Sequence, residues 1–207
     1  MRKLYKEALS IFLEGMISSE MPIFKKIKIS SQERRINLIP REYFIYEKKL
    51  EKIAFYLHFI PLDDDSVQIE VGWSEKLKFP SSISRFPIFQ FKDEYISQKE
   101  FLFDLNICSD RANKTSELSW SLWNCAVTMP FVDLAMKNNI NYMLKYEREY
   151  QQYKEAYIAE AIRVISLDEA LNNTKRALAD LASEIKICVF PIFEKKKSKM
   201  NHPSQNQ

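Results

Sequence analysis

Glycine is nearly absent from this sequence, whose 207 residues include only Gly15 and Gly72. Loops that cradle phosphates or a dinucleotide need several closely spaced glycines, because their backbone approaches the ligand closely. Two glycines so far apart cannot form such a loop. The sequence therefore excludes a glycine-rich phosphate loop and a dinucleotide fingerprint.

Histidine and cysteine are also scarce. The chain has two histidines and three cysteines, widely spaced and without a CxxC motif: His58, His202, Cys108, Cys125 and Cys188. A structural zinc site needs three or four clustered cysteine or histidine ligands. A histidine-based triad would depend on His58 alone, since His202 lies among the last residues. We therefore expect reduced cysteines, no metal and no cofactor.

Long apolar runs are missing as well. No run reaches the roughly 20 residues that a membrane-spanning helix needs. Charges at Lys6, Glu7 and Glu14 interrupt the first apolar residues, unlike the continuous apolar segment of a signal peptide. With 46% hydrophobic and 13% aromatic residues, the composition is typical of a folded protein. We expect a cytoplasmic protein that does not insert into a membrane.

The net charge of +3 is unevenly distributed. Basic side chains outnumber acidic ones in residues 1–52, whereas acidic side chains outnumber basic ones in residues 53–110. Four lysines then follow Glu194 near the end of the chain. Such polarity either creates an oriented electrostatic surface or reflects internal pairing of charges, and internal pairing is the more common outcome.

Apolar periodicity predicts a helix followed by strands in the first half of the chain. Apolar residues recur at helical spacing up to Pro22. Residues 23–29, 34–46 and 101–107 instead alternate between apolar and polar, as strands with one buried face do. This order predicts one helix packed on an antiparallel meander.

Residues 53–59 and 67–73 predict a hairpin within this meander. Large apolar side chains alternate along both runs. In the expected register Phe59 lies opposite Val67 and Leu57 opposite Ile69, which buries every large residue on one face. The connection is then the sequence PLDDDS.

The aspartates of this connection raise the question of an active site. Nucleases of the restriction-enzyme type place an aspartate before a strand that carries Glu-x-Lys, and the two carboxylates hold a metal ion. Glu70 would be the second carboxylate here, but Gly72 occupies the position of the lysine. Aspartates also suit a solvated turn, because their side chains bond to nearby backbone. We interpret Asp63, Asp64 and Asp65 as a hairpin tip and assign no catalytic residue.

The last third of the chain predicts an antiparallel helical hairpin. Helical spacing runs from about residue 130 to Ile165 and places five tyrosines on one stripe. Ser166 and Glu169 have the spacing of a capping box that starts a second helix. Apolar residues then form a seam over residues 171–188, and Pro191 would end the helix.

Together these patterns predict an α+β protein with an N-terminal helix, an antiparallel β-meander and a C-terminal antiparallel helical hairpin. Residues 1–110 would form the helix and the sheet, residues 111–193 a helical region packed on them, and residues 194–207 a disordered basic tail. Residues 117–127 fit a strand and a helix equally well, so their structure stays open.

One group of candidate binding residues lies on the polar side of the hairpin. Tyr56, His58, Gln68 and Glu70 alternate with the apolar residues and therefore share the opposite face. If no helix covers this face, the four side chains form a polar patch for a ligand or partner. Most such faces are merely solvated.

A second group consists of arginines and tyrosines. Arg34, Arg35 and Arg41 would lie on the neighbouring strand, where they complement Glu70 or meet an acidic surface or phosphates. Tyr146 and Tyr153 belong to the tyrosine stripe, and we expect them at its exposed edge. A protein partner or a second copy of the chain would contact them there.

Four segments resemble a bacterial family of small α+β proteins of unknown function. They read IFKKIKI, FIYEKKLEKIAFYLHFIP, VQIEVGWS and ALADLASEIKICVFPIFEK. Members of that family share a leading helix, a meander that ends near a position like Gly72, and a closing helix with a step like Pro191–Phe193. The resemblance implies an α+β fold and a role in protein interaction or bacterial conflict, and it supplies no catalytic residue.

These observations favour a non-enzymatic interaction protein, of an immunity type or a defence-system accessory type, that binds another macromolecule. A protein is the expected partner, and self-association is compatible with the tyrosine stripe. The alternative is a protein that acts on nucleic acid. It would be either a degenerate metal-dependent nuclease or a binder that uses Arg34, Arg35, Arg41 and the basic tail.

Overall fold

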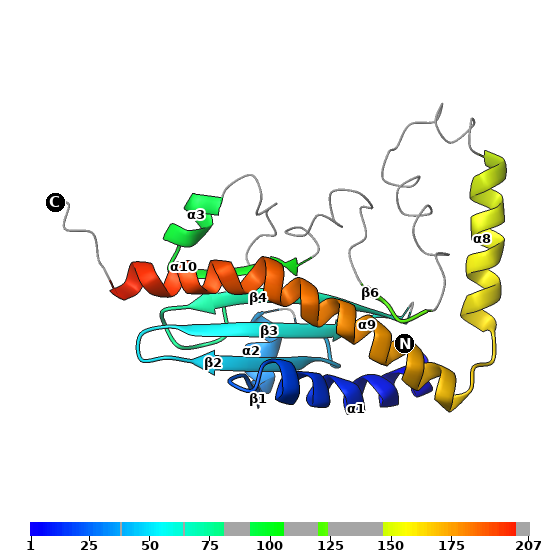
Figure 1. Ribbon diagram of the computed structural model, residues 1–207, viewed down its shortest axis with the longest axis horizontal. Coiled ribbons are helices and arrows are strands. Elements are labelled where there is room, and N and C mark those ends of the chain that lie inside the picture. Colours follow the sequence, from blue (N-terminus) through cyan, green and yellow to red (C-terminus); the bar gives the residue numbers. More distant parts are fainter. Residues whose placement is uncertain (38, 64, 81–91, 106–119, 124–146, 202–207) are drawn as a thin grey trace.

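The computed structural model describes residues 1–37, 39–63, 65–80, 92–105, 120–123 and 147–201. It confirms an α+β fold, with an N-terminal helix, an antiparallel sheet and a C-terminal helix (Figure 1). The helices in these ranges are α1 (Lys3–Glu20), α2 (Ser31–Ile36), α3 (Lys92–Ser97), α8 (Glu147–Ile162), α9 (Leu167–Glu184) and α10 (Phe190–Asn201). The strands are β1 (Lys25–Ile27), β2 (Phe44–Lys49), β3 (Ala54–Pro61), β4 (Ser66–Ser74), β5 (Glu100–Asp104) and β6 (Trp120–Ser121).

The sheet is a meander, as the sequence predicts. Strands β1 to β5 lie side by side in chain order, and every neighbouring pair is antiparallel. The short strand β6 pairs with the start of β4. Of the open segment 117–127, the part Trp120–Ser121 is therefore a strand.

The predicted strand over residues 34–46 is wrong in its first part. Ser31–Ile36 form α2, because Ser30 and Glu33 build a capping box that starts a helix. The Ser30 hydroxyl accepts the Glu33 N–H, and the Glu33 carboxylate accepts the Ser30 N–H. Arg34 and Arg35 consequently lie on a helix, and the strand begins only at Phe44.

The β3–β4 hairpin forms in a register two residues away from the predicted one. Phe59 lies opposite Ile69 and Leu57 opposite Val71. The apolar residues keep their shared face, because a shift of two residues preserves the alternation. The turn is tighter than predicted because Asp65 adopts a positive φ of 56°, and the Leu62 N–H donates to the Ser66 carbonyl at 2.9 Å.

Helices α1 and α9 cover one face of the sheet and share its core. The core joins Tyr5, Leu9 and Leu13 of α1 with Leu178 and Leu181 of α9. The sheet contributes its apolar face through Phe55, Leu57, Phe59, Val67, Ile69, Val71, Trp73, Phe101 and Phe103. The two helices run in the same direction along this face (Figure 1).

The predicted antiparallel pairing of the last two helices is not observed. Helix α8 rises away from the start of α9 instead of lying along it (Figure 1). The apolar seam of α9 packs on α1 and the sheet, where its leucines join the core. The capping box at Ser166 is confirmed in its first part, since the Ser166 hydroxyl accepts the Glu169 N–H at 3.1 Å.

The helix does not stop at Pro191. Ile185–Val189 form a π-helical turn in which the Phe190 N–H donates to the Ile185 carbonyl, and α10 continues from there. Because proline has no N–H and its ring crowds the preceding turn, a wider turn just before it relieves the conflict. The predicted disordered tail is therefore wrong up to Asn201, and residues 202–207 lie outside the described part of the chain.

Candidate functional site

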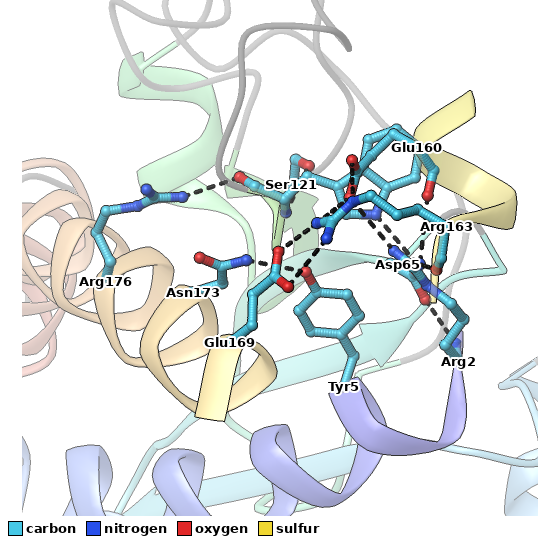
Figure 2. A network of polar contacts seen from close by, with 10 residues as sticks. Arg2, Tyr5, Asp65, Ser121, Glu160, Arg163, Glu169, Asn173 and Arg176 are labelled. Atoms are coloured by element: carbon cyan, nitrogen blue, oxygen red, sulfur yellow. Dashed lines mark hydrogen bonds and ion pairs between the residues drawn. The ribbon is translucent and has the colours of Figure 1, made fainter. Parts of the chain in front are cut away.

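A cluster of polar side chains joins α1 to the β3–β4 turn and to the α8–α9 connection (Figure 2). We call it the polar junction. Its members are Arg2, Tyr5, Asp65, Trp123, Glu160, Arg163, Glu169 and Asn173. Residues from five separate parts of the sequence meet here, so the junction fixes how those parts are arranged.

Asp65 is the centre of the polar junction. Its carboxylate accepts hydrogen bonds from the backbone N and the Nε of Arg2, both at 2.5 Å, and from the Trp123 indole at 3.1 Å. Arg2 is the N-cap of α1 and supplies no side-chain cap of its own. Asp65 thus caps α1 from another element, and a carboxylate is favourable at a helix N-terminus. The predicted solvated tip is wrong for Asp65, which is buried, whereas Asp63 is exposed.

Arg2 also binds the end of α8. Its guanidinium donates to the backbone carbonyls of Arg163 at 2.6 Å and Glu160 at 3.3 Å. Carbonyls in the last turn of a helix have no partner within the helix, so a cation satisfies them well. The guanidinium lies over the rings of Tyr5 and Trp123 at 5.2 and 6.0 Å. One arginine thereby connects the hairpin turn with the end of α8.

Arg163 holds the connection between α8 and α9. Its guanidinium bonds to Glu160 at 2.7 and 2.9 Å and to Glu169, one bond being 3.0 Å. The hydrogen bond from Arg163 lowers the pKa of Glu169 below its ordinary value, and the same contact raises the pKa of Arg163. The last turn of α8 and the first turn of α9 are therefore tied together across four connecting residues.

Aliphatic side chains surround this connection and face solvent. We call them the elbow surface: Ile158, Ile162, Val164 and Leu167. Their exposed fractions are 48%, 77%, 92% and 48%. A single exposed aliphatic residue is ordinary on a protein surface, but several of them in one connection beside charged residues are typical of an interaction site. The charged residues here are Glu160, Arg163 and Glu169.

The predicted polar patch exists on the other face of the sheet, but it is buried. It forms a row of three hydrogen-bonded pairs, which we call the polar row: Tyr56–Glu47 at 2.9 Å, His58–Glu70 at 2.9 Å and Gln68–Asp104 at 3.1 Å. Burial raises the pKa of Tyr56, and the Glu47 carboxylate beside it raises it further. A macromolecule cannot touch Tyr56, His58 or Glu70 in this arrangement, since each is at most 6% exposed.

His58 is the one histidine that the structure describes. Its Nδ1 faces Glu70, and the rings of Tyr43 and Phe79 pack edge-on against its imidazole. Within the described residues its Nε2 has no hydrogen-bond partner. A carboxylate at Nδ1 favours the tautomer that leaves Nε2 as an acceptor. With the ring 1% exposed, this pair packs the sheet rather than presenting a base to a substrate.

None of the three predicted arginines lies on a strand. Arg34 and Arg35 lie on α2, and Arg41 lies in the segment before β2. Arg35 and Arg41 are exposed, and Arg34 is half-buried. They do not complement Glu70, whose carboxylate faces His58 instead. The exposed Lys25 and Lys26 lie on β1, an edge strand where charge discourages pairing with another sheet.

The tyrosine stripe is only partly within the described residues. Tyr146 lies outside them, and Tyr153 is placed in α8 without a described side chain. Sequence reasoning missed the polar junction and the elbow surface. A signal for the elbow surface was present, because Ile162, Val164 and Leu167 flank a helix break, where polar residues are usual.

The described residues include neither a metal-ligand cluster nor a membrane-spanning helix. No group of three His, Cys, Asp or Glu side chains within them is arranged to hold a metal. No helix in the described ranges is long and apolar enough to span a bilayer. Comparison with protein-family models, with curated proteins and with solved structures finds no match.

Proposed function

We propose that this chain is a non-enzymatic binding protein whose partner is another protein, and that the elbow surface is the contact. The observation that carries the proposal is the exposure of Ile162 and Val164 at 77% and 92% on a connection held by the Arg163–Glu169 ion pair and by the hydrogen bonds from Arg2. Exposed aliphatic side chains in a fixed arrangement present a surface that needs little ordering upon binding. Protein interfaces combine such an apolar centre with a charged rim.

The alternative is a metal-dependent nuclease, which would need carboxylates to bind its metal ion. Both candidate carboxylates already have partners in this structure. Asp65 binds Arg2 and Trp123, and Glu70 faces His58. Lysines of the predicted basic tail also have internal partners. Lys195 lies 3.1 Å from Asp93, and the buried Lys196 lies 3.1 Å from Glu75. These contacts favour protein binding over nucleic-acid binding.

A photo-crosslinking amino acid at position 162 tests the proposal in cells of the source organism. We expect a discrete crosslinked product that contains a second protein. The matched control places the same amino acid at Ile36, which is 68% exposed on α2 and outside the elbow surface. The purified partner should bind the unmodified chain, and Ile162→Ser with Val164→Ser should weaken binding at least tenfold without changing the melting temperature. Equal binding by this double variant would contradict the proposal.

A divalent-ion cleavage assay on plasmid and single-stranded DNA tests the alternative. We expect no cutting with Mg²⁺ or Mn²⁺. Metal-dependent cutting that disappears in Glu70→Ala would replace our proposal with the nuclease.

An immunity-type or defence-associated role is the narrower form of the proposal and rests on the family resemblance. The products of neighbouring genes, tested as binding partners, would support it or contradict it.

A further inference from the structure

A groove between α1 and α9 is separate from the elbow surface. Its volume is about 420 Å³, within the range of about 300–1,000 Å³ typical of small-molecule sites. One wall comes from α1 and the other from α9. Glu20 lies at the end of the α1 wall; on the other wall Lys175 and Ala179 lie on α9, and Lys186 lies in the π-helical turn that follows it.

The floor of the groove is apolar. Phe12, Met16, Leu178 and Ala182 supply ring and aliphatic surface, and the two serines Ser19 and Ser183 are the uncharged polar groups of the lining. Such a lining has few donors and acceptors for a nucleobase or a sugar. It suits an aliphatic chain, because burial of each CH₂ is favourable by itself.

Gly15 gives the groove its room. A Cβ built on Gly15 would meet no atom within 4 Å, so packing does not require a glycine at this position. A glycine inside a helix is less favourable than alanine by about 1 kcal/mol. Gly15 therefore costs helix stability and leaves open space above the floor, which is where a ligand would lie.

The two ends of the groove differ in charge, because a different lysine lies at each end. Lys186 forms an ion pair with Glu20, so its charge is already neutralised. Lys175 is exposed, and among the described residues no carboxylate forms an ion pair with it. Lys186 lies in the π-helical turn that follows α9, about three helical turns and about 16 Å along the axis from Lys175. The groove thus has a cationic end at Lys175 and a neutralised end at Lys186.

From these features we propose that the groove binds a single-chain aliphatic amphiphile with an anionic head group. The head lies at Lys175, and the chain runs over Met16 and Leu178 toward Ala182. The open space above Gly15 accommodates the chain. This site is independent of the elbow surface, so the failure of one proposal leaves the other unaffected.

Calorimetric titration of the full chain with dodecanoate below its micelle concentration tests the inference. We expect one molecule bound per chain. Affinity should rise about fourfold for each CH₂ from octanoate to dodecanoate until the groove is filled. Absence of binding, or several weak molecules per chain, would overturn the proposal.

Single substitutions test the contact with the ligand's head group separately from the contact with its aliphatic chain. Lys175→Gln should weaken dodecanoate binding by about two- to fivefold, as expected for an exposed ion pair, and leave dodecanol binding unchanged. Lys25→Gln, the same change on the exposed edge strand β1, should alter neither. If dodecanol bound the unmodified chain as tightly as dodecanoate, the proposal of an anionic head group would be overturned.

Two blocking variants test the place of binding. Gly15→Leu fills the open space and should lower dodecanoate affinity more than tenfold. Ala179→Leu blocks the groove from α9 and should have the same effect, which keeps the test valid if one variant does not fold. Unchanged affinity in a folded blocking variant would overturn the assignment to this groove.

Discussion

Arg2 and Asp65 are 63 positions apart in the sequence, yet the Arg2 Nε lies 2.5 Å from the Asp65 Oδ2. The same carboxylate caps α1 through the Arg2 backbone N–H. The pair is shielded from solvent, since the Asp65 side chain is 3% exposed and the Arg2 side chain 23%. A contact between the first helix and the β3–β4 turn thus stabilises the end of the molecule where α8 and α9 meet.

Asp65→Asn should lower the free energy of unfolding by about 3 kcal/mol, because breaking a buried ion pair leaves an uncompensated charge. Asparagine tolerates the positive φ at this position, so the change tests the charge and not the backbone. Asp63→Asn, in the same turn but exposed, is the matched control and should change stability by less than about 0.5 kcal/mol. Urea unfolding measures both, and equal effects would contradict the role of Asp65.

Leu178→Ala should cost about 2–5 kcal/mol, through lost burial and the cavity left between α9 and α1. Leu178 is 3% exposed. Leu167→Ala removes the same atoms from a residue that is 48% exposed and should cost much less. Thermal melts of the two variants compare them directly, and a benign Leu178→Ala would argue against the packing of α9 on α1.

The two glycines should respond to alanine in opposite directions. A Cβ at Gly72 would lie 2.3 Å from the Phe101 carbonyl oxygen on the neighbouring strand, so Gly72→Ala should destabilise the sheet by about 1–3 kcal/mol. Here the close approach of β5 requires glycine. Chemical denaturation measures the loss, and a fully stable variant would mean that β4 and β5 are not paired at this position.

Gly15→Ala should instead raise the free energy of unfolding by about 1 kcal/mol, since alanine is the better helix former and its Cβ meets nothing. The measurement is the shift in the urea midpoint at constant slope. A destabilised Gly15→Ala would indicate that the space above Gly15 is filled.

Stability should fall above about pH 10. Burial raises the pKa of Tyr46 and of Tyr95 to about 12, and it also raises the pKa of Tyr5. Below the ordinary value of 10 these hydroxyls are protonated in both states, so the full stability is present. As the pH rises toward 12, the unfolded chain loses its protons first, and unfolding becomes easier. Melting temperatures measured from pH 10 to 12 test this decline. Tyr46→Phe removes one of these hydroxyls and should make the decline shallower.

The sequence predicts the secondary structure of this chain better than its long-range contacts. Alternation along residues 53–59 and 67–73 correctly gives the buried face of the hairpin, because burial has the same period as the strand. The register depends on the turn, and the turn depends on Asp65 meeting Arg2 and Trp123. No local pattern contains that information. The seam of α9 is likewise visible as apolar spacing, while its choice of α1 over α8 is a matter of tertiary packing.

The candidate site was harder to predict than the fold. The shared face of Tyr56, His58 and Glu70 follows from alternation, but their burial does not, since polar residues on one side of a hairpin are usually solvated. The Asp65 carboxylate looks like a turn residue in the sequence and is an ion-pair partner in the structure. Its role depends on residues before α1 and after β6, which a reading of the turn alone does not include.

The number of residues in the π-helical turn Ile185–Val189 sets how α10 is rotated about its own axis. A turn that closes on the fifth residue contains one residue more than an α-helical turn, and each residue rotates a helix by about 100°. With this extra residue, Phe193 stacks on Phe55 and Lys196 reaches Glu75. Deletion of one residue here would rotate both side chains away from the sheet. The stretch should therefore tolerate substitution far better than a change in length.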